Sequence, residues 1–259
     1  MQNKFRLFYL IFSVYLIMIS CSTNTEPTQT EIEYPTILFP IGRVKADSIQ
    51  NSIRTNEFFS NIDDYGLFSF YGTLNRGNSN ITDKNVAIRL AKESLLKYSK
   101  FSNVFDTSKI EIEDATNYDP TTQRFSDWTI LFKNQKYDGI EVLQSGIIVI
   151  VHDQVNQIIG HHFKDISVPT KNLLPEKKLE EKIVGQKIKS GGKVNSEITI
   201  TSEMIIKDKI TKSILWSELN NSIEFRVVWN IPIGYTTEII RWNMYIDILS
   251  GEILSYKIN

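Results

Sequence analysis

Cysteine is almost missing from this sequence, because Cys21 is the only one among 259 residues. A single thiol cannot form an intramolecular disulfide, and no other cysteine exists for a thiolate metal site or a cysteine nucleophile. If the thiol of Cys21 is modified, the folded part contains no disulfide and must be stabilised by its apolar core, which a chain of this length can supply.

An excess of charge of one sign is also missing, since 29 basic residues stand against 30 acidic residues. Without a basic excess we expect no nucleic-acid partner and no electrostatic attraction to anionic lipid. Seven prolines and twelve glycines are too few for a collagen-like or low-complexity chain. The hydrophobic content of 41% indicates a globular protein instead.

Common catalytic motifs are missing as well. The sequence contains no Gly-x-Ser-x-Gly elbow and no His-Glu-x-x-His zinc motif. The glycine-rich stretch that begins at Ser190 follows a predicted helix, so we interpret it as a helix end rather than a phosphate-binding loop. We therefore predict no catalytic residue and no cofactor, and we expect that the protein is not an enzyme.

The first 21 residues contain the most informative pattern that is present. Lys4 and Arg6 precede a non-ionic stretch, residues 7–20. This stretch is shorter than the roughly 20 residues of a membrane-spanning helix and has the length of a signal-peptide core. Residues 18–21, Met-Ile-Ser-Cys, resemble the lipobox of bacterial lipoproteins. The resemblance implies a signal peptide at residues 1–20 and acyl chains, such as palmitate, on Cys21.

Residues 21–33 are predicted to be the lipidated cysteine and a flexible tether, because residues 22–33 contain almost no apolar side chain. Stable anchoring needs two or more acyl chains, which the lipobox resemblance supplies. We expect the lipid on Cys21 to hold the protein at a cell-envelope membrane, in the periplasm. Ser22 favours the outer membrane over the outer face of the inner membrane.

The remaining sequence predicts an α+β fold with two helices. Residues 82–99 contain the clearest helix, with Thr82 as its N-cap. Its apolar stripe consists of Ala87, Leu90, Ala91, Ser94, Leu95 and Tyr98. Pro175 opens the second helix, and the stripe of that helix is Leu179, Ile183 and Ile188.

Alternating and β-branched segments predict strands around these helices. The predicted strands cover residues 34–40, 65–74, 110–113, 128–132, 140–143, 147–151, 158–163, 198–200, 224–229, 238–247 and 252–257. Turn residues separate them at 117–123, 136–139, 230–237 and 249–251. We expect tandem units in which one helix packs on a curled antiparallel sheet, with domains at residues 34–168 and 169–259.

Two stretches resemble known domain families. Residues 242–254 resemble the C-terminal hairpin of PepSY domains, with an aromatic residue, alternation, Asp247 and a Gly-Glu turn. Residues 136–151 are similar to the fungalysin/thermolysin propeptide family, with Glu141 in place of the usual proline. The resemblance implies a propeptide-like N-terminal domain, a PepSY-like C-terminal domain, and inhibition or chaperoning of a partner protease.

The three histidines surround one predicted hairpin and are His152, His161 and His162. A turn centred on residues 155–156 would place His152 opposite Ile159, so that His152 and His161 share a face near Asp153. Such a group could hold zinc, and a zinc-dependent hydrolase is the alternative function. The other interpretation is that the histidines are surface residues beside a turn, or that one packs against Phe163, without a metal.

Other conspicuous side chains have structural interpretations. Trp128, Trp229 and Trp242 lie within predicted strands, so we expect them in the core rather than on a carbohydrate-binding face. Asp247 is expected to accept hydrogen bonds in the tight turn that follows it. The adjacent carboxylates at 63–64 and 180–181 are expected on solvated faces.

Together these observations favour a non-catalytic cell-envelope lipoprotein that acts as a binding or protease-regulating module. The expected partners are the membrane, through the lipid on Cys21, and an envelope or secreted protease. A structural or ligand-binding envelope protein is the third possibility.

Overall fold

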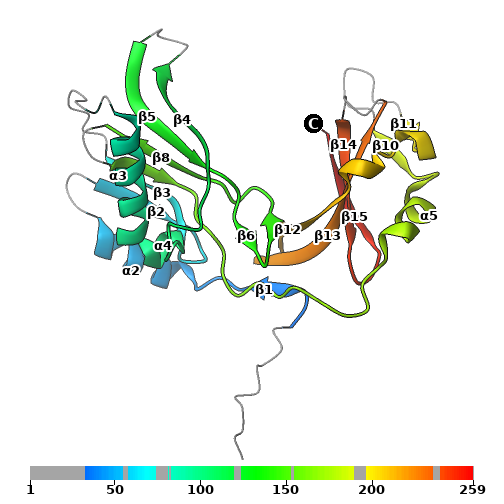
Figure 1. The fold of residues 1–259 in the computed structure, drawn as a ribbon. Helices are drawn as coiled ribbons and strands as arrows, with labels where there is room; N and C mark the ends of the chain where they lie inside the picture. Colours follow the sequence, from blue (N-terminus) through cyan, green and yellow to red (C-terminus); the bar gives the residue numbers. More distant parts are fainter. Residues whose placement is uncertain are drawn as a thin grey trace, which may run out of the picture. The chain divides into compact units, whose positions relative to one another are not determined.

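The computed structural model describes residues 33–54, 58–73, 81, 83–119, 124–152, 155–189, 197–235 and 240–258. The predicted signal peptide, Cys21 and most of the predicted tether lie outside the described residues. Residues 32–259 form one compact unit with two apolar cores, one on each of two large sheets (Figure 1). The α+β class predicted from the sequence is confirmed. Within the described part of the chain, no helix has the length and apolar character needed to span a bilayer.

The first sheet has six antiparallel strands in the order β2-β3-β9-β8-β5-β4. These strands are β2 (Phe58–Ile62), β3 (Phe68–Thr73), β4 (Ile112–Asp119), β5 (Arg124–Phe132), β8 (Ile147–Val151) and β9 (Val155–Ile159). Strand β8 shows how one face becomes the core, because Ile147, Val149 and Val151 are buried while the residues between them are half-buried. Helix α2 (Arg43–Ile53) contacts β2, in a segment for which no helix was predicted.

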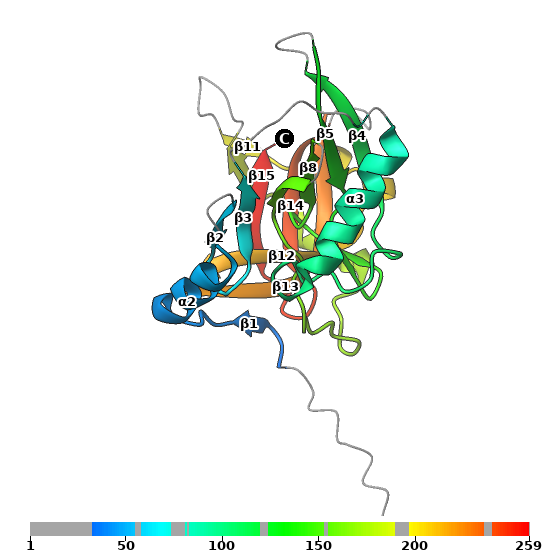
Figure 2. The same ribbon diagram turned by 90° about the vertical axis from the view of Figure 1, so that its left-hand side faces the viewer.

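Helix α3 (Lys84–Lys97) lies across this sheet, followed by the short helix α4 (Ser99–Ser102) (Figures 1 and 2). The predicted stripe is confirmed by its buried members, which are Ala87, Ala91, Ser94 and Leu95. The predicted cap is wrong, since Asp83 is the N-cap and Thr82 lies outside the described residues. Asp83 accepts hydrogen bonds from the amides of Asn85 at 2.7 Å and Val86 at 3.3 Å, which satisfies two free donors of the first turn.

The second sheet has seven strands, with β1 joined to β13 beside the path β15-β14-β13-β12-β7-β6. These strands are β1 (Thr36–Leu38), β6 (Lys136–Tyr137), β7 (Ile140–Val142), β12 (Thr211–Leu219), β13 (Ser222–Gly234), β14 (Ile240–Asp247) and β15 (Ile253–Ile258). The pair β7–β12 is parallel, whereas the other pairs of this sheet are antiparallel. Strands from both sides of residue 168 therefore share one sheet. The division into domains at residues 34–168 and 169–259 stays a prediction.

The segment after residue 168 contains the smaller elements of the fold. They are η1 (Glu176–Lys178), α5 (Leu179–Ile183), β10 (Lys187–Lys189), β11 (Glu197–Thr199), η2 (Ser202–Met204) and η3 (Lys207–Lys209). Helix α5 buries Leu179 and Ile183 in the core of the second sheet, as predicted. It is shorter than predicted, because Gly185 adopts a φ of 88° and Ile188 pairs with Ile198 in the hairpin β10–β11.

Several predicted turns are partly strands in the structure, including residues 136–137, which form β6, and residues 155–157, which belong to β9. Strand β13 continues through residues 230–234, because Ile231 and Ile233 are buried in the core of the second sheet. Strand β4 continues to Asp119, where a turn from Asn117 was expected. Strands β2, β6, β10 and β12 were not predicted.

The three tryptophans expected in the core are buried. The indole N–H of Trp128 donates to the backbone carbonyl of Ile81 at 2.9 Å. The indole N–H of Trp229 donates to the carbonyl of Leu174 at 3.0 Å, and that of Trp242 donates to the carbonyl of Lys189 at 3.0 Å. Each polar atom that these rings bring into the core is therefore satisfied.

Candidate functional site

His152 lies at the end of β8, and its Nδ1 contacts a carboxylate oxygen of Asp127 on β5. The prediction that His152 lies opposite Ile159 is wrong, because the partner of Ile159 is Ile148. The hairpin turns earlier than expected, since Val151 already pairs with Val155 after a bulge whose extra residue lies in β9. The imidazole of His152 consequently faces β5 instead of His161.

His161 lies at the opposite end of the same hairpin. Its neighbour Gly160 lies against the backbone of Gly146, which precedes His152 by six residues. At about 3.3 Å per residue, the two histidines are on the order of 20 Å apart. A zinc ion shared by His152 and His161 is therefore excluded, and Asp153 lies outside the described residues. Within the described ranges, no three His, Cys, Asp or Glu side chains form a metal-binding group.

His161 and His162 lie in the segment that leads from the first sheet to the second. Nδ1 of His161 lies 2.7 Å from the carbonyl oxygen of Phe68, and its ring packs edge-on against Phe163 at 4.9 Å. This contact confirms the interpretation of a histidine packed against Phe163. Burial lowers the pKa of His161, and burial together with the neighbouring His161 lowers the pKa of His162 to about 4.

His161 also lines a cleft between the two sheets, which we call the acidic cleft. It consists of two adjoining cavities of about 740 and 140 Å³. Both cavities are lined by Asp63, Tyr65 and Glu218. The larger one adds Arg43 and Asp64, among others, and the smaller one adds His161, Phe163 and Trp216.

A tight turn between β2 and β3 positions the acidic side chains on the first sheet. One carboxylate oxygen of Asp63 accepts hydrogen bonds from the amides of Tyr65 at 3.0 Å and Leu67 at 2.9 Å. Gly66 supplies the positive φ of 82° that this turn needs. The carboxylate of Asp63 therefore has a structural function in addition to its place in the cleft.

A two-residue hairpin loop positions Glu218 on the other side of the cleft. Asn220 and Asn221 connect β12 to β13 with φ values of 51° and 60°. Positive φ at both loop residues matches the twist of the two strands, and asparagine tolerates this conformation. Glu218 precedes the loop and is paired in register with Ile223, at the end of the sheet that faces the cleft.

Negative charge dominates the acidic cleft, with three carboxylates and one guanidinium. Arg43 lies 3.3 Å from Asp64 and 2.7 Å from Asp47, and all three side chains are exposed. Burial raises the pKa of Tyr65, and the charges of Glu218, Asp63 and Asp64 raise it further. The three carboxylates therefore act on the same phenol, although they come from two sheets.

His161 contributes a ring of defined tautomer to the lining of the smaller cavity. The carbonyl of Phe68 can only accept, so Nδ1 of His161 donates and Nε2 of the neutral ring carries the lone pair. Nε2 is buried and has no hydrogen-bond partner among the described residues. It is the three carboxylates that make the acidic cleft suited to a group that donates hydrogen bonds and carries positive charge.

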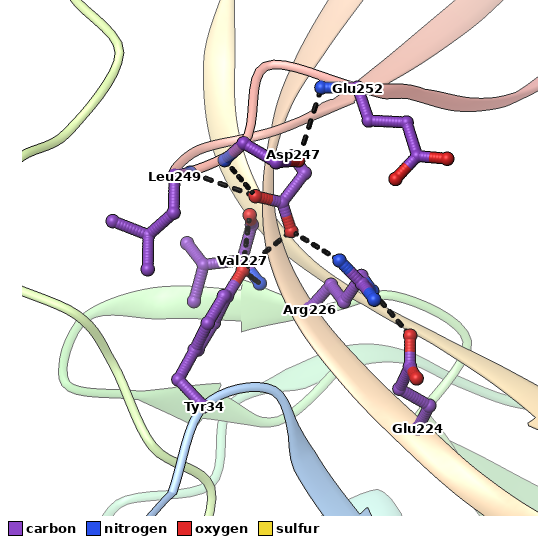
Figure 3. A network of polar contacts seen from close by, with 8 residues as sticks. Tyr34, Glu224, Arg226, Val227, Asp247, Leu249 and Glu252 are labelled. Atoms are coloured by element: carbon purple, nitrogen blue, oxygen red, sulfur yellow. Dashed lines mark hydrogen bonds and ion pairs between the residues drawn. The ribbon is translucent and has the colours of Figure 1, made fainter.

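A second polar cluster centres on Asp247, which is fully buried (Figure 3). One carboxylate oxygen accepts from the amides of Leu249 at 2.8 Å and Ser250 at 2.7 Å. The other accepts from the Tyr34 hydroxyl at 2.9 Å and the Arg226 guanidinium at 3.1 Å. The predicted turn-stabilising function is confirmed, and the same carboxylate attaches the segment before β1 to the C-terminal hairpin.

The pKa of Asp247 reflects two opposing effects. Burial raises it, but the hydrogen bonds from Ser250, Leu249, Tyr34 and Arg226 outweigh burial and leave the pKa below its ordinary value. The carboxylate is therefore ionised and fully engaged at neutral pH, which makes it a structural centre rather than a catalytic acid.

Sequence reasoning did not identify the acidic cleft. It placed Asp63 and Asp64 on a solvated face and gave Glu218 no role. The local signal at residues 63–66 is a turn, and nothing in it indicates that a strand far along the chain contributes a third carboxylate.

Comparison with models of protein families and with curated proteins finds no match. Among solved structures, the chain is similar to the Bacillus megaterium YpeB C-terminal domain, with 11% sequence identity and a TM-score of 0.35. The similarity covers 85% of this chain and 98% of that chain.

Proposed function

We propose that the protein is a non-catalytic binding module that holds a segment of a partner protein in the acidic cleft. The observation that carries this proposal is the cleft itself, with a cavity of about 740 Å³ and side chains from both sheets. A cavity of several hundred Å³ with a few placed polar groups is typical of binding sites. The turn of Asp63 and the hairpin loop before Ser222 hold the two walls in defined positions.

We further propose that a lipid on Cys21 attaches this module to a cell-envelope membrane, with the outer membrane favoured by Ser22. The basic start and the lipobox-like residues 18–21 support this location. Mass spectrometry of the native polypeptide tests it. A mass that begins at an acylated Cys21 is expected, whereas an intact Met1 or an unmodified sulfur would overturn the proposal.

The expected partner is an envelope or secreted protease. Support for this partner comes from the sequence, in which residues 136–151 are similar to propeptides and residues 242–254 resemble PepSY domains. A propeptide-like module inhibits or chaperones the enzyme that it binds. The acidic cleft would then receive a surface segment of the protease.

Site-specific photo-crosslinking of the full chain in cells tests the binding function. A benzophenone side chain replaces Ser69, which lines the cleft, and in a control it replaces Leu96, which is 41% exposed on α3. We expect one discrete adduct with an envelope protein from position 69 and none from position 96. Equal adduct patterns from both positions, or no adduct from position 69, would contradict a binding function at the cleft.

The identity of the adduct tests the regulatory version separately. If the partner is a protease, its activity on a peptide substrate should change when the purified full chain is added. An adduct with a protein that is not a protease would overturn protease regulation and leave the binding module intact.

A further inference from the structure

We infer that the segment bound in the acidic cleft is basic and presents lysine or arginine side chains to it. This inference rests on the proposed binding function and specifies the chemistry of the partner. It is carried by the charge of the cleft and by the aromatic rings that line it.

The charge of the cleft favours a cation. Asp63 and Asp64 from the first sheet and Glu218 from the second line the cleft with Tyr65, whose pKa is raised by burial and by these three charges. Among the described residues that line the cleft, Arg43 is the one cation, and it is already engaged with two carboxylates, those of Asp47 and Asp64. A cationic side chain that enters the cleft therefore meets carboxylates on both walls, and a carboxylate or phosphate is repelled.

Aromatic rings complete the match. Tyr65 and Trp216 line the smaller cavity, and the indole N–H of Trp216 is held by the carbonyl of Leu143 at 2.8 Å. A ring whose polar atom is already bonded presents only its π surface and edge to a ligand. Lysine and arginine can bind such surfaces through cation–π contact and through their apolar stems.

A metal ion fits the cleft less well than an organic cation. Calcium requires six to eight oxygen ligands gathered within about 2.6 Å of the ion. Among the described residues the carboxylates of the cleft do not gather into a metal-binding group. Long side chains can reach carboxylates that are spread over two walls, which a small ion cannot do.

Fluorescence anisotropy with the full chain tests the inference. The probe is a labelled lysine-glycine repeat peptide, and glutamine replaces each lysine in the reference peptide. We expect the lysine peptide to bind at least tenfold more tightly, with an affinity that falls as salt increases. The cleft variant Asp64→Asn/Glu218→Gln should lose at least tenfold of this affinity.

A matched control separates the cleft from the overall charge of the protein. The variant Glu181→Gln/Asp208→Asn removes the same charge from two exposed positions and should bind the lysine peptide like the wild type. Equal binding of the lysine and glutamine peptides, or an equal loss in both variants, would overturn the inference. Circular dichroism confirms that each variant is folded, and Asp63 is left unchanged because its carboxylate also holds the turn.

The two proposals can fail separately. If the adduct from position 69 persists undiminished in the cleft variant, the module binds a partner but does not select basic side chains. If the lysine peptide binds as expected and no adduct forms in cells, the charge preference holds and the proposed binding function fails.

Discussion

Replacing Asp247 with alanine removes a carboxylate that is fully buried and holds four groups at once. Two of these groups are the amides of the tight turn, and the others are the Tyr34 hydroxyl and the Arg226 guanidinium (Figure 3). Removing one partner of a buried ion pair costs roughly 3–5 kcal/mol, because the remaining charge stays buried without compensation. Arg226 keeps its contact with Glu224, so we expect a loss near the middle of this range, about 4 kcal/mol.

The variant Asp247→Asn separates the charge from the turn. The introduced amide keeps an oxygen for the backbone N–H groups of Leu249 and Ser250, but it turns an NH₂ group toward Arg226. Hydrogen bonds to charged groups contribute about 1.5–3 kcal/mol, so this variant should cost about 2 kcal/mol. The order of stability is therefore wild type, then the asparagine variant, then the alanine variant.

Urea unfolding followed by tryptophan fluorescence measures these differences at pH 7. A loss of about 4 kcal/mol should lower the melting temperature by roughly 12 °C for a chain of this size. Asp208→Ala, at an exposed position, serves as the control and should change stability by less than about 0.5 kcal/mol. An alanine variant that loses less than about 1 kcal/mol, or an asparagine variant as unstable as alanine, would refute the reasoning.

Three further predictions follow from single contacts. The folded pKa of His162, about 4, lies below its ordinary value of 6.5, so its contribution to stability is complete above pH 6.5 and is lost as pH falls toward 4. Between pH 7 and pH 4, the free energy of unfolding of the wild type should fall by about 3 kcal/mol more than that of His162→Gln, as measured by urea titration. Parallel pH profiles of the two proteins would contradict this. Gly160→Ala should lower the free energy of unfolding by at least about 1 kcal/mol more than Gly185→Ala. Both glycines have a φ of 88°, but only a Cβ at position 160 would lie 2.9 Å from a backbone oxygen. Equal melting temperatures of these two alanine variants would show that the close approach to Gly146 is unimportant. Asp83→Ala should cost about 1 kcal/mol in the same assay by removing the N-cap of α3, and an unchanged stability would disprove that function.

Helix α3 could be predicted because its signals are local. Apolar residues at helical spacing and a capping side chain act within one or two turns of the same segment. The cap was assigned one residue early, to Thr82 instead of Asp83, which is a common scale of error for a helix end. The turn after Asp247 was predictable for the same reason, since the carboxylate and the amides that it accepts lie within three residues.

Strand β12 could not be predicted because its burial does not alternate. Ser213 and Ile214 are both buried, and the next two residues are half-buried, since the strand lies between β13 and the parallel strand β7. The end of α5 was predicted too late because Gly185 was not recognised as the residue with positive φ. Such features depend on neighbours that are distant in the sequence.

The histidine hairpin shows the same limit more sharply. Residue spacing placed His152 and His161 on one face, but a turn that comes earlier than expected and a bulge in β9 changed the register. In a strand a small change of register changes every cross-strand neighbour. The predicted metal-binding pair was therefore lost, and His161 became part of the lining of the acidic cleft.

The sequence by itself determined the α+β class, the stripe of helix α3, the buried tryptophans and the turn that follows Asp247. Each of these depends on composition or on residues that interact within a few positions of one another. Only the tertiary structure decided which carboxylates meet at the acidic cleft, which histidine lines it, and how far apart the histidines lie. These features require the pairing register of strands and the meeting of segments far apart in the chain, and both are determined by packing of the whole core rather than by any local pattern.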